Sequence, residues 1–324
     1  MGQRFVLGGE QEPERVDKVL ARLLPGTSRA SVQRWIAEGR VLLDGEPCRA
    51  RDAAVAGSVL EVEPGPLPRS RAEPDASVQF GVLFEDEHLI VIDKPAGLVV
   101  HPARGHAGGT LVNGLLAREG FEPAPSDERD RQGALRPGIV HRIDKETSGI
   151  LVVAKDERTR EGLKAQLSEH SVDRIYRALT LGVPLGGTIR SLHARDPRHR
   201  LKFTSRTETG RRAVTHVAVL ETLAGKRAAY VECRLETGRT HQIRVHLAER
   251  ARTPIVGDRL YGRTPGDADV AAVADELGRQ ALHAAVLGFE HPVTGERHRF
   301  ESSLPLDFSR ALERLRKLES SATS

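Results

Sequence analysis

The chain has 324 residues, and 49 Lys and Arg against 45 Asp and Glu leave a formal net charge of +4, which is mild for a protein that binds a polyanion. Apolar residues make up 39% and charged residues 29%, a composition typical of globular proteins, and the sequence has no eighteen-residue apolar run that would span a membrane. Cys48 and Cys233 are too far apart to indicate a disulfide framework or a zinc site, so a reducing cytoplasm is the expected location. Residues 1–14 are too polar for a signal peptide and are interpreted as an N-terminal extension.

The first predicted unit covers residues 15–63. The expected elements are helices over residues 16–24 and between residues 28 and 39, followed by strands over residues 41–43 and 59–62. Ser28 is placed to cap the second helix, and Pro25-Gly26 and Gly39 are expected to end the first and second helices.

Two helices that lead into a small sheet resemble the S4-type RNA-binding module. Arg29, Arg34 and Arg40 lie on and directly after the second helix, where this resemblance places RNA contacts. The alternative is a small domain with an ordinary polar surface, because short patterns also match by chance.

A linker is expected after this unit. Residues 64–79 contain four prolines and little that could pack, which predicts an extended segment. The second domain is placed over residues 80–318, with a tail over residues 319–324. Its first elements are predicted as strands over residues 89–92 and 98–100, a helix over residues 110–119 and a loop over residues 122–136.

Residues 141–155, HRIDKETSGILVVAK, join a charge-dense turn to a short apolar segment. The run over residues 150–154 is rich in β-branched residues and predicts a buried strand. Asp144 is flanked by His141, Arg142 and Lys145, so nearby cations favour its ionised form. A reactive loop at the mouth of a strand has this pattern, but a solvated turn in which Asp144 is a local cap fits the residues at least as well.

The rest of the second domain contains both helices and strands. The expected elements are helices over residues 156–170, 240–250 and 307–318, and strands over residues 174–181, 213–220, 228–235, 281–289 and 298–301. Thr240 is placed to cap the middle helix, and residues 265–275 predict an irregular loop. Tyr176 lies among apolar residues, which favours an ordinary core tyrosine over a ring presented to a ligand.

Cofactor motifs are missing from the sequence. His241 and His246 are five residues apart, about 140° around a helix, so they do not form the paired ligand of a zinc site. The sequence also has no phosphate-cradling glycine loop and no dinucleotide fingerprint. Neither a metal nor a nucleotide cofactor is therefore expected.

One short stretch concentrates positive charge. Its cationic residues are Arg195, Arg198, Arg200, Lys202, Arg206, Arg211 and Arg212. Contact with phosphates and a solvated arginine-rich surface are equally consistent with this pattern. Aromatic residues are only 4% of the chain, which argues against a single-strand binder built on many stacking platforms.

Six segments of the second domain resemble, together and in order, the RluA-type pseudouridine synthases. They are KPAGLVVHP at residues 94–102, HRIDKETSGILVVAK, the strand that begins Arg174-Ile175-Tyr176, ETGRTHQIRVH at residues 236–246, GDRLYG at residues 257–262, and Leu282-His283-Ala284. With the S4-like unit, the sequence is most similar to the branch that modifies bacterial 23S ribosomal RNA, the synthase D branch. In this sequence the HRIDKETSGILVVAK motif begins with His141, whereas the related branch that modifies the small subunit has Gly at that position.

The resemblance implies an α+β fold and a set of roles. A small S4-like domain is expected before a catalytic domain whose central sheet is mixed, mainly antiparallel and flanked by helices. Asp144 is implied as the central catalyst, as a nucleophile or as a base that gives a glycal intermediate, with Arg244 as its ion-pair partner. Tyr176 is implied to stack on the target uracil, and Arg142 to fill the space left by the flipped base.

The remaining expectations concern RNA. His141 is expected beside the substrate as a loop-shaping residue, and Arg195 and Arg239 are expected to contact RNA. The implied partner is ribosomal RNA, at the helix 69 hairpin loop of 23S RNA, and the protein is expected to act as a monomer without a cofactor or a membrane. The alternatives are another 23S or transfer RNA site, or a noncatalytic ribosome-assembly factor.

Overall fold

The computed structural model describes residues 2–8, 12–25, 27–65, 72–102, 108–119, 121 and 138–320. Several predictions lie outside these ranges, in whole or in part: the Gly26 helix stop, residues 66–71 of the linker, the loop over residues 122–136 and the end of the tail.

The first unit has two helices and a small sheet. Its elements are β1 (Gln3–Val6), β2 (Glu14–Arg15), α1 (Val16–Leu23), α2 (Arg29–Ala37), β3 (Val41–Leu43), β4 (Glu46–Pro47), β5 (Ala53–Ala54) and β6 (Val59–Val62). The four-stranded sheet has the order β1-β6-β3-β4. Ser28 caps α2 as predicted, because its side chain accepts a hydrogen bond from Ser31 N. β1 falls within the segment interpreted as an extension, yet it pairs with β6 over its whole length.

The second unit is larger. Its elements are β7 (Gly81–Glu85), β8 (Leu89–Lys94), α3 (Leu111–Leu116), β9 (Ser148–Ala154), α4 (Glu157–Glu169), β10 (Asp173–Leu181), β11 (Gly187–Arg195), β12 (Phe203–Thr204), β13 (Arg211–Leu223), β14 (Ala228–Leu235), α5 (Gln242–Val245), the π-helical segment η2 (His246–Arg250), α6 (Ala268–Leu277), β15 (Leu282–Glu290), β16 (Arg297–Glu301) and α7 (Leu306–Ser320).

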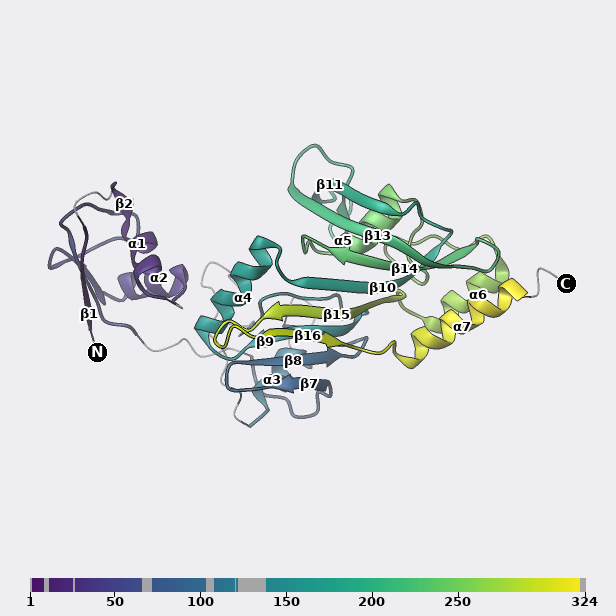
Figure 1. Ribbon diagram of the computed structural model, residues 1–324, viewed down its shortest axis with the longest axis horizontal. Coiled ribbons are helices and arrows are strands. Elements are labelled where there is room, and N and C mark those ends of the chain that lie inside the picture. The colour runs from purple at the N-terminus through teal and green to yellow at the C-terminus, as the bar shows by residue number, and fades with distance from the viewer. Residues whose placement is uncertain are drawn as a thin grey trace.

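A ten-stranded sheet organises this unit (Figure 1). Its order is β12-β11-β13-β14-β10-β15-β9-β8-β7, and β16 also pairs with β15. β15 runs parallel to β9, whereas every other pairing among the described strands of this sheet is antiparallel. The predicted mixed, mainly antiparallel sheet is therefore confirmed.

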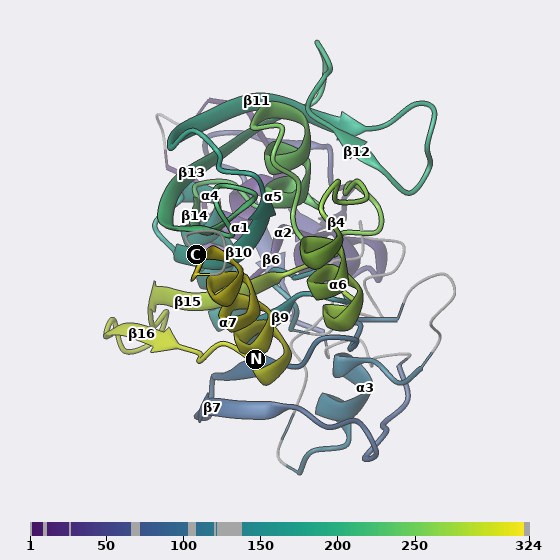
Figure 2. The ribbon, with the colours of Figure 1, turned by 90° about the vertical axis from the view of Figure 1, so that its right-hand side faces the viewer.

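Successive side chains of the central strands point to opposite faces of the sheet, and helices pack on both faces. Leu151 and Val153 of β9 join a core cluster that includes residues of α3, α5, α6 and α7. Ile150 and Val152 point the other way and pack in a second cluster with Leu163 of α4. α6 and α7 lie side by side at the end of the molecule that faces the viewer in Figure 2.

Three local predictions were wrong. Residues 98–100 form no strand; the carbonyl oxygens of Val99 and Val100 accept hydrogen bonds from the first amides of α3. Residues 265–275 contain most of α6. Asp267 caps the N-terminus of this helix, because its side chain accepts a hydrogen bond from Val270 N. Thr240 does not cap α5, because His241 occupies the N-cap position in a left-handed conformation with φ 59°.

The two units touch through α2 and α4. Glu157 Oε1, in the first turn of α4, accepts hydrogen bonds from Ser28 N at 2.8 Å and from Ser31 Oγ at 2.5 Å. Both serines are buried. In Figure 1 the first unit accordingly lies at one end of the long axis, next to α4.

Within the described ranges, no helix is both long and apolar enough to cross a membrane. The same ranges hold no cluster of three His, Cys, Asp or Glu side chains suited to a metal ion.

Candidate active site

Asp144 lies in the loop that leads directly into β9, and the strand behind it is rigid. All seven residues of β9 are buried. Gly149 has φ 109°, and a Cβ atom there would lie 2.2 Å from Ala284 O of β15, so only glycine fits this close approach. The strand predicted over residues 150–154 is confirmed and starts two residues earlier, which places Asp144 at its mouth.

A buried lysine ties the Asp144 loop to the end of β8. Lys94 is fully buried, and its Nζ donates hydrogen bonds to the carbonyl oxygens of Pro95, Leu98 and Lys145 at 2.7, 2.9 and 3.0 Å. Burial lowers the pKa of Lys94 to about 7, although Glu146 and Asp144 act in the opposite direction. On the other side, Arg279 Nη1 donates to Glu146 O at 3.1 Å.

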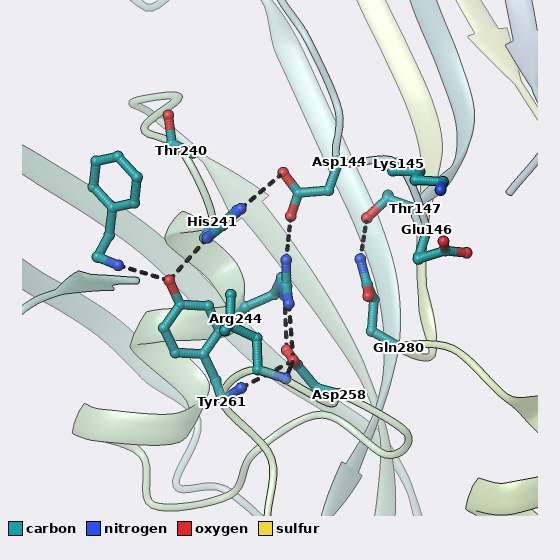
Figure 3. Close-up of polar contacts among 12 residues, drawn as sticks. Asp144, Lys145, Glu146, Thr147, Thr240, His241, Arg244, Asp258, Tyr261 and Gln280 are labelled. Carbon is teal, nitrogen blue, oxygen red and sulfur yellow. Dashed lines mark hydrogen bonds and ion pairs between the residues drawn. The ribbon is translucent and has the colours of Figure 1, made fainter. Parts of the chain in front are cut away.

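Arg244 joins two carboxylates at the centre of the site (Figure 3). Its Nη1 donates to Asp144 Oδ2 at 2.9 Å, while its Nε and Nη2 donate to the two oxygens of Asp258 at 2.7 and 2.8 Å. Asp258 also accepts hydrogen bonds from Leu260 N and Tyr261 N, which leaves its carboxylate fully engaged. Arg244 is thus fixed from behind by Asp258 and directed at Asp144 in front.

The charges in this cluster support one another. Burial lowers the pKa of Arg244, but the hydrogen bonds that Arg244 donates to Asp258 and the pairing with Asp144 outweigh it and raise that pKa above the usual arginine value. Burial likewise raises the pKa of Asp258, yet its bonds with Arg244 bring the net shift below the usual range. Both groups therefore stay charged at neutral pH.

Two further side chains complete the polar network in Figure 3. His241 Nε2 lies 3.8 Å from Asp144 Oδ1, and its Nδ1 lies 2.8 Å from the hydroxyl oxygen of Tyr261. That oxygen also accepts a hydrogen bond from Phe203 N at 2.8 Å. The Tyr261 ring packs against the Arg244 guanidinium, 5.1 Å from ring centroid to Cζ.

A cavity of about 720 Å³ opens over this network. The polar and aromatic residues that line it include Arg142, Asp144, Arg174, Tyr176, Arg239, His241 and Arg244. Tyr176 is 8% exposed, and burial raises its pKa to about 12, with Arg174 lowering it and Asp144 raising it further. The cavity thus combines one carboxylate, several cations and a buried aromatic ring, and its volume is typical of a small-molecule or nucleotide-sized site.

The predicted residues around Asp144 are found near the cavity. His141 Nε2 accepts a hydrogen bond from Val152 N of β9 at 3.1 Å, and burial, assisted by Arg174, lowers the pKa of His141 to about 3. Arg142 is exposed, and its Nη1 donates to His101 Nε2 at 3.2 Å. Glu146 points away from the Asp144 carboxylate in Figure 3, so the two do not form a carboxylate pair.

The predicted RNA-contacting arginines differ in their surroundings. Arg239 lines the cavity and donates from Nε to Arg212 O at 3.0 Å. Arg195 is exposed, does not line the cavity and stacks over Phe203, 4.8 Å from Cζ to the ring centroid. Their contacts with RNA remain predictions.

In the first unit the three predicted arginines are near acidic side chains. Arg29 pairs with Asp17 at 2.8 Å, and the Arg34 side chain, only 10% exposed, lies 3.6 Å from Glu38. Arg40, 33% exposed, is the most open of the three and pairs with Glu38 at 3.1 Å. Their RNA-binding role also remains a prediction.

Sequence reasoning gave no role to Asp258, His241, Tyr261 or Arg174. The turn at Gly257-Asp258 was visible in the sequence, but nothing in its spacing connects it to Arg244. The signal that was present is the GDRLYG segment itself, in which Asp258 and Tyr261 are three residues apart and both contact Arg244.

Comparisons with protein families agree with this division into two units. Residues 88–249 match the RNA pseudouridylate synthase family, and residues 14–57 match the S4 domain.

Individual relatives match nearly the whole chain. The chain is 45% identical over 306 residues to a ribosomal large subunit pseudouridine synthase D of Neisseria meningitidis, covering 93% of this chain and 79% of that one. It is 43% identical over 326 residues to the protein of that name from Pseudomonas aeruginosa, covering 97% and 94%. An uncharacterized RNA pseudouridine synthase of Bacillus subtilis is 42% identical over 313 residues, covering 95% and 96%.

Solved structures are also similar to this chain. The human RNA pseudouridylate synthase domain containing protein 4 matches with a TM-score of 0.53 at 27% identity, covering 73% of this chain and 93% of that one.

Proposed function

The chain belongs to the RNA pseudouridylate synthase family, and from this premise we propose that it converts uridine to pseudouridine in large-subunit ribosomal RNA. The enzyme class, an RNA pseudouridine synthase, follows from the family. The substrate is part of the proposal, and it is supported by relatives that are named for the large subunit. The proposed target is the hairpin loop of helix 69 in 23S ribosomal RNA, and the proposed setting is a monomer in the cytoplasm.

The observation that carries the proposal is the state of Asp144. Its carboxylate is held by a single hydrogen bond from Arg244, faces the cavity and is 16% exposed. The Arg244 guanidinium, itself held by Asp258, places a fixed positive charge against Oδ2. The site therefore presents a carboxylate backed by a fixed cation to the cavity.

One carboxylate suffices for the proposed reaction. The N1 bond to the sugar breaks, the uracil turns, and C5 bonds to the same sugar carbon. C5 then loses its proton and N1 takes one up, so no atoms are gained or lost overall. Asp144 serves either as a nucleophile or as the base that takes a sugar proton to give a glycal. Both routes begin with the same ionised oxygen.

Tyr176 is proposed to bind the base. Its ring lines the cavity that Asp144 faces. Because burial raises its pKa to about 12, its hydroxyl stays protonated at neutral pH. Stacking against the uracil is therefore its main proposed role, and it can assist removal of the C5 proton only if another group accepts a proton from it.

Arg142 is proposed to occupy the gap that a flipped uridine leaves. It is exposed, lies two residues from Asp144 and lines the same cavity. Flipping costs least for bases that are not in a duplex, which favours a hairpin loop as the target.

The test is a map of pseudouridines in ribosomal and transfer RNA from cells that lack the protein. Restoring the wild type should restore the missing sites, and Asp144→Asn should not. Asp275→Asn, the same change at an exposed position of α6, is the matched control and should restore every site.

The possible outcomes test the enzymatic activity and the RNA target separately. If no pseudouridine is lost in the deletion, the enzymatic proposal fails, and a noncatalytic assembly factor becomes the better account. If the lost sites lie in transfer RNA or elsewhere in 23S RNA, only the helix 69 assignment fails. If Asp144→Asn restores the sites, the catalytic assignment fails.

A further inference from the structure

His241 occupies an unusual place in the chain. It precedes α5 with φ 59°, a left-handed conformation that is uncommon outside glycine. Such a conformation is held against a local free-energy cost and is concentrated at functional sites. The His241 side chain is 18% exposed and lines the cavity beside Asp144.

The surroundings of His241 favour one tautomer. The Tyr261 oxygen accepts a hydrogen bond from Phe203 N and lies 2.8 Å from His241 Nδ1, so its O–H can donate to Nδ1. Burial raises the pKa of Tyr261 to about 12, so that hydroxyl keeps its proton. With Nδ1 as the acceptor, the proton of a neutral imidazole is on Nε2.

The proton on Nε2 faces the catalytic carboxylate. Nε2 lies 3.8 Å from Asp144 Oδ1, while Arg244 Nη1 lies 2.9 Å from Oδ2. The two oxygens of Asp144 therefore each face a different donor (Figure 3). The separation of 3.8 Å is longer than a hydrogen bond, and contacts of this kind commonly shorten when substrate binds.

Burial favours the neutral form of His241. Burial lowers its pKa, Asp144 and Asp258 raise it, and Arg244 and Arg142 lower it, with a net shift below the ordinary value of 6.5. It can therefore donate one proton to Asp144 without neutralising the carboxylate charge.

We propose that His241 is a positioning residue for the isomerisation, which orients Asp144 through Nε2–H while Tyr261 fixes its tautomer. Arg244 alone leaves the Asp144 carboxylate free to rotate about its Cβ–Cγ bond. A second donor on the other oxygen fixes the carboxylate plane, so that the same oxygen always faces the sugar. This inference rests on the proposed function, because it assigns a role within that reaction.

The test measures single-turnover kinetics with the full-length protein and an RNA transcript of the helix 69 hairpin. His241→Ala should lower the maximal rate about 10- to 100-fold, and the half-saturating protein concentration should stay within about twofold. His241→Gln retains an amide donor at a similar reach and should recover a large part of the loss. His241→Asn tolerates the left-handed conformation but is too short to reach Asp144, so it should fold like the wild type and react as slowly as His241→Ala.

A second variant leaves the backbone at position 241 unchanged. Tyr261→Phe keeps the ring against Arg244 but removes the hydroxyl that fixes the tautomer, and it should lower the maximal rate about 3- to 10-fold. Combined with His241→Ala, it should add no further loss, because both changes act on the same contact.

Several results would overturn the inference. They are a wild-type rate in His241→Asn, a loss that appears only in the half-saturating concentration, and additive effects of the His241 and Tyr261 changes. If the wild-type protein forms no pseudouridine in this or any other ribosomal RNA transcript, the proposed function itself fails, which is a distinct outcome.

Discussion

Asp17 and Asp144 are both paired with arginine, and they differ in how completely they are bound. Asp17 in α1 has no exposed side-chain surface and accepts hydrogen bonds from Arg15, Arg29 and Gln33. Asp144 accepts one hydrogen bond, from Arg244, and its other oxygen faces His241 and the cavity. The first carboxylate joins α1 to α2, whereas the second keeps an oxygen facing the cavity.

The difference shows that an ion pair by itself does not mark a catalytic residue. A buried carboxylate whose acceptor sites are filled contributes to the fold, and removing one partner leaves an uncompensated charge. A carboxylate that accepts few hydrogen bonds and faces a cavity keeps acceptor sites free and is suited to react. Asp258, which has four donors, belongs with Asp17 although it touches the same arginine as Asp144.

The largest expected effect is that of Asp144→Asn. Because the amide can serve neither as a nucleophile nor as a base, the maximal single-turnover rate should fall at least about 1000-fold. The melting temperature should change little, since the Asp144 carboxylate has only one hydrogen bond. A rate within tenfold of the wild type would place the reactive oxygen elsewhere.

Asp258→Asn should have an intermediate effect. It weakens the fixation of Arg244 without touching the substrate, so the rate should fall about 10- to 100-fold, as is typical when a supporting partner is lost. Thermal unfolding in parallel separates misplacement of Arg244 from general unfolding. An unchanged rate would mean that Asp144 alone is enough to place Arg244.

Asp17→Asn should reverse the pattern seen at Asp144. Breaking this buried network should lower the free energy of unfolding by about 3 kcal/mol, while the maximal rate at saturating RNA should be retained. Urea unfolding of the full chain, followed by the fluorescence of Trp35 in the same core, is the measurement.

The same variant should change the response to acid. Burial raises the pKa of Asp17, but hydrogen bonds from Gln33, Arg29 and Arg15 bring the net pKa below 3.8. The contribution of Asp17 is therefore complete above pH 3.8 and is lost as the pH falls toward the lowered folded-state pKa. The wild type should lose this stability in that window and Asp17→Asn should not, so parallel acid unfolding curves would contradict the assignment.

The smallest expected effect is that of Arg40→Ala. Arg40 is partly exposed and pairs with acidic neighbours, so its proposed phosphate contact should contribute less than about 1 kcal/mol and change the salt slope of RNA binding by about one. Arg314→Ala, an exposed position on α7 at the far end of the molecule, is the matched control. Equal RNA binding by the two variants would argue against an RNA contact at this surface of the S4 unit.

Local patterns predicted most elements, and tertiary contacts account for what they missed. The buried run of β9 and the capped helix α4 follow from residues that are adjacent in sequence. β1 forms because β6, more than fifty residues away, offers a free edge, which a segment of only four residues does not indicate. α6 was hidden by the preceding Pro265 and Gly266, although Asp267 and Gly278 are ordinary helix ends.

The residues of the candidate site also fall into two groups, those that the sequence indicates and those that only tertiary contacts bring together. Asp144 and its partner Arg244 could be assigned through the resemblance to a family, and the structure places them 2.9 Å apart. Asp258 and His241 contact this pair through the turn after η2 and the left-handed residue before α5. Neither contact follows from residue spacing, because both depend on how two separate turns pack.

α4 contacts the first unit at its N-terminal end and the cavity near its C-terminal end. Its first residue, Glu157, holds the serines of α2, while Leu167 and Ser168 near its end and His170 just beyond it line the cavity. Thirteen helical residues span about 20 Å, so α4 sets the distance between its contact with the S4 unit and the cavity. Lengthening the proline-rich linker should leave that distance unchanged as long as Glu157 keeps its hydrogen bonds with Ser28 and Ser31.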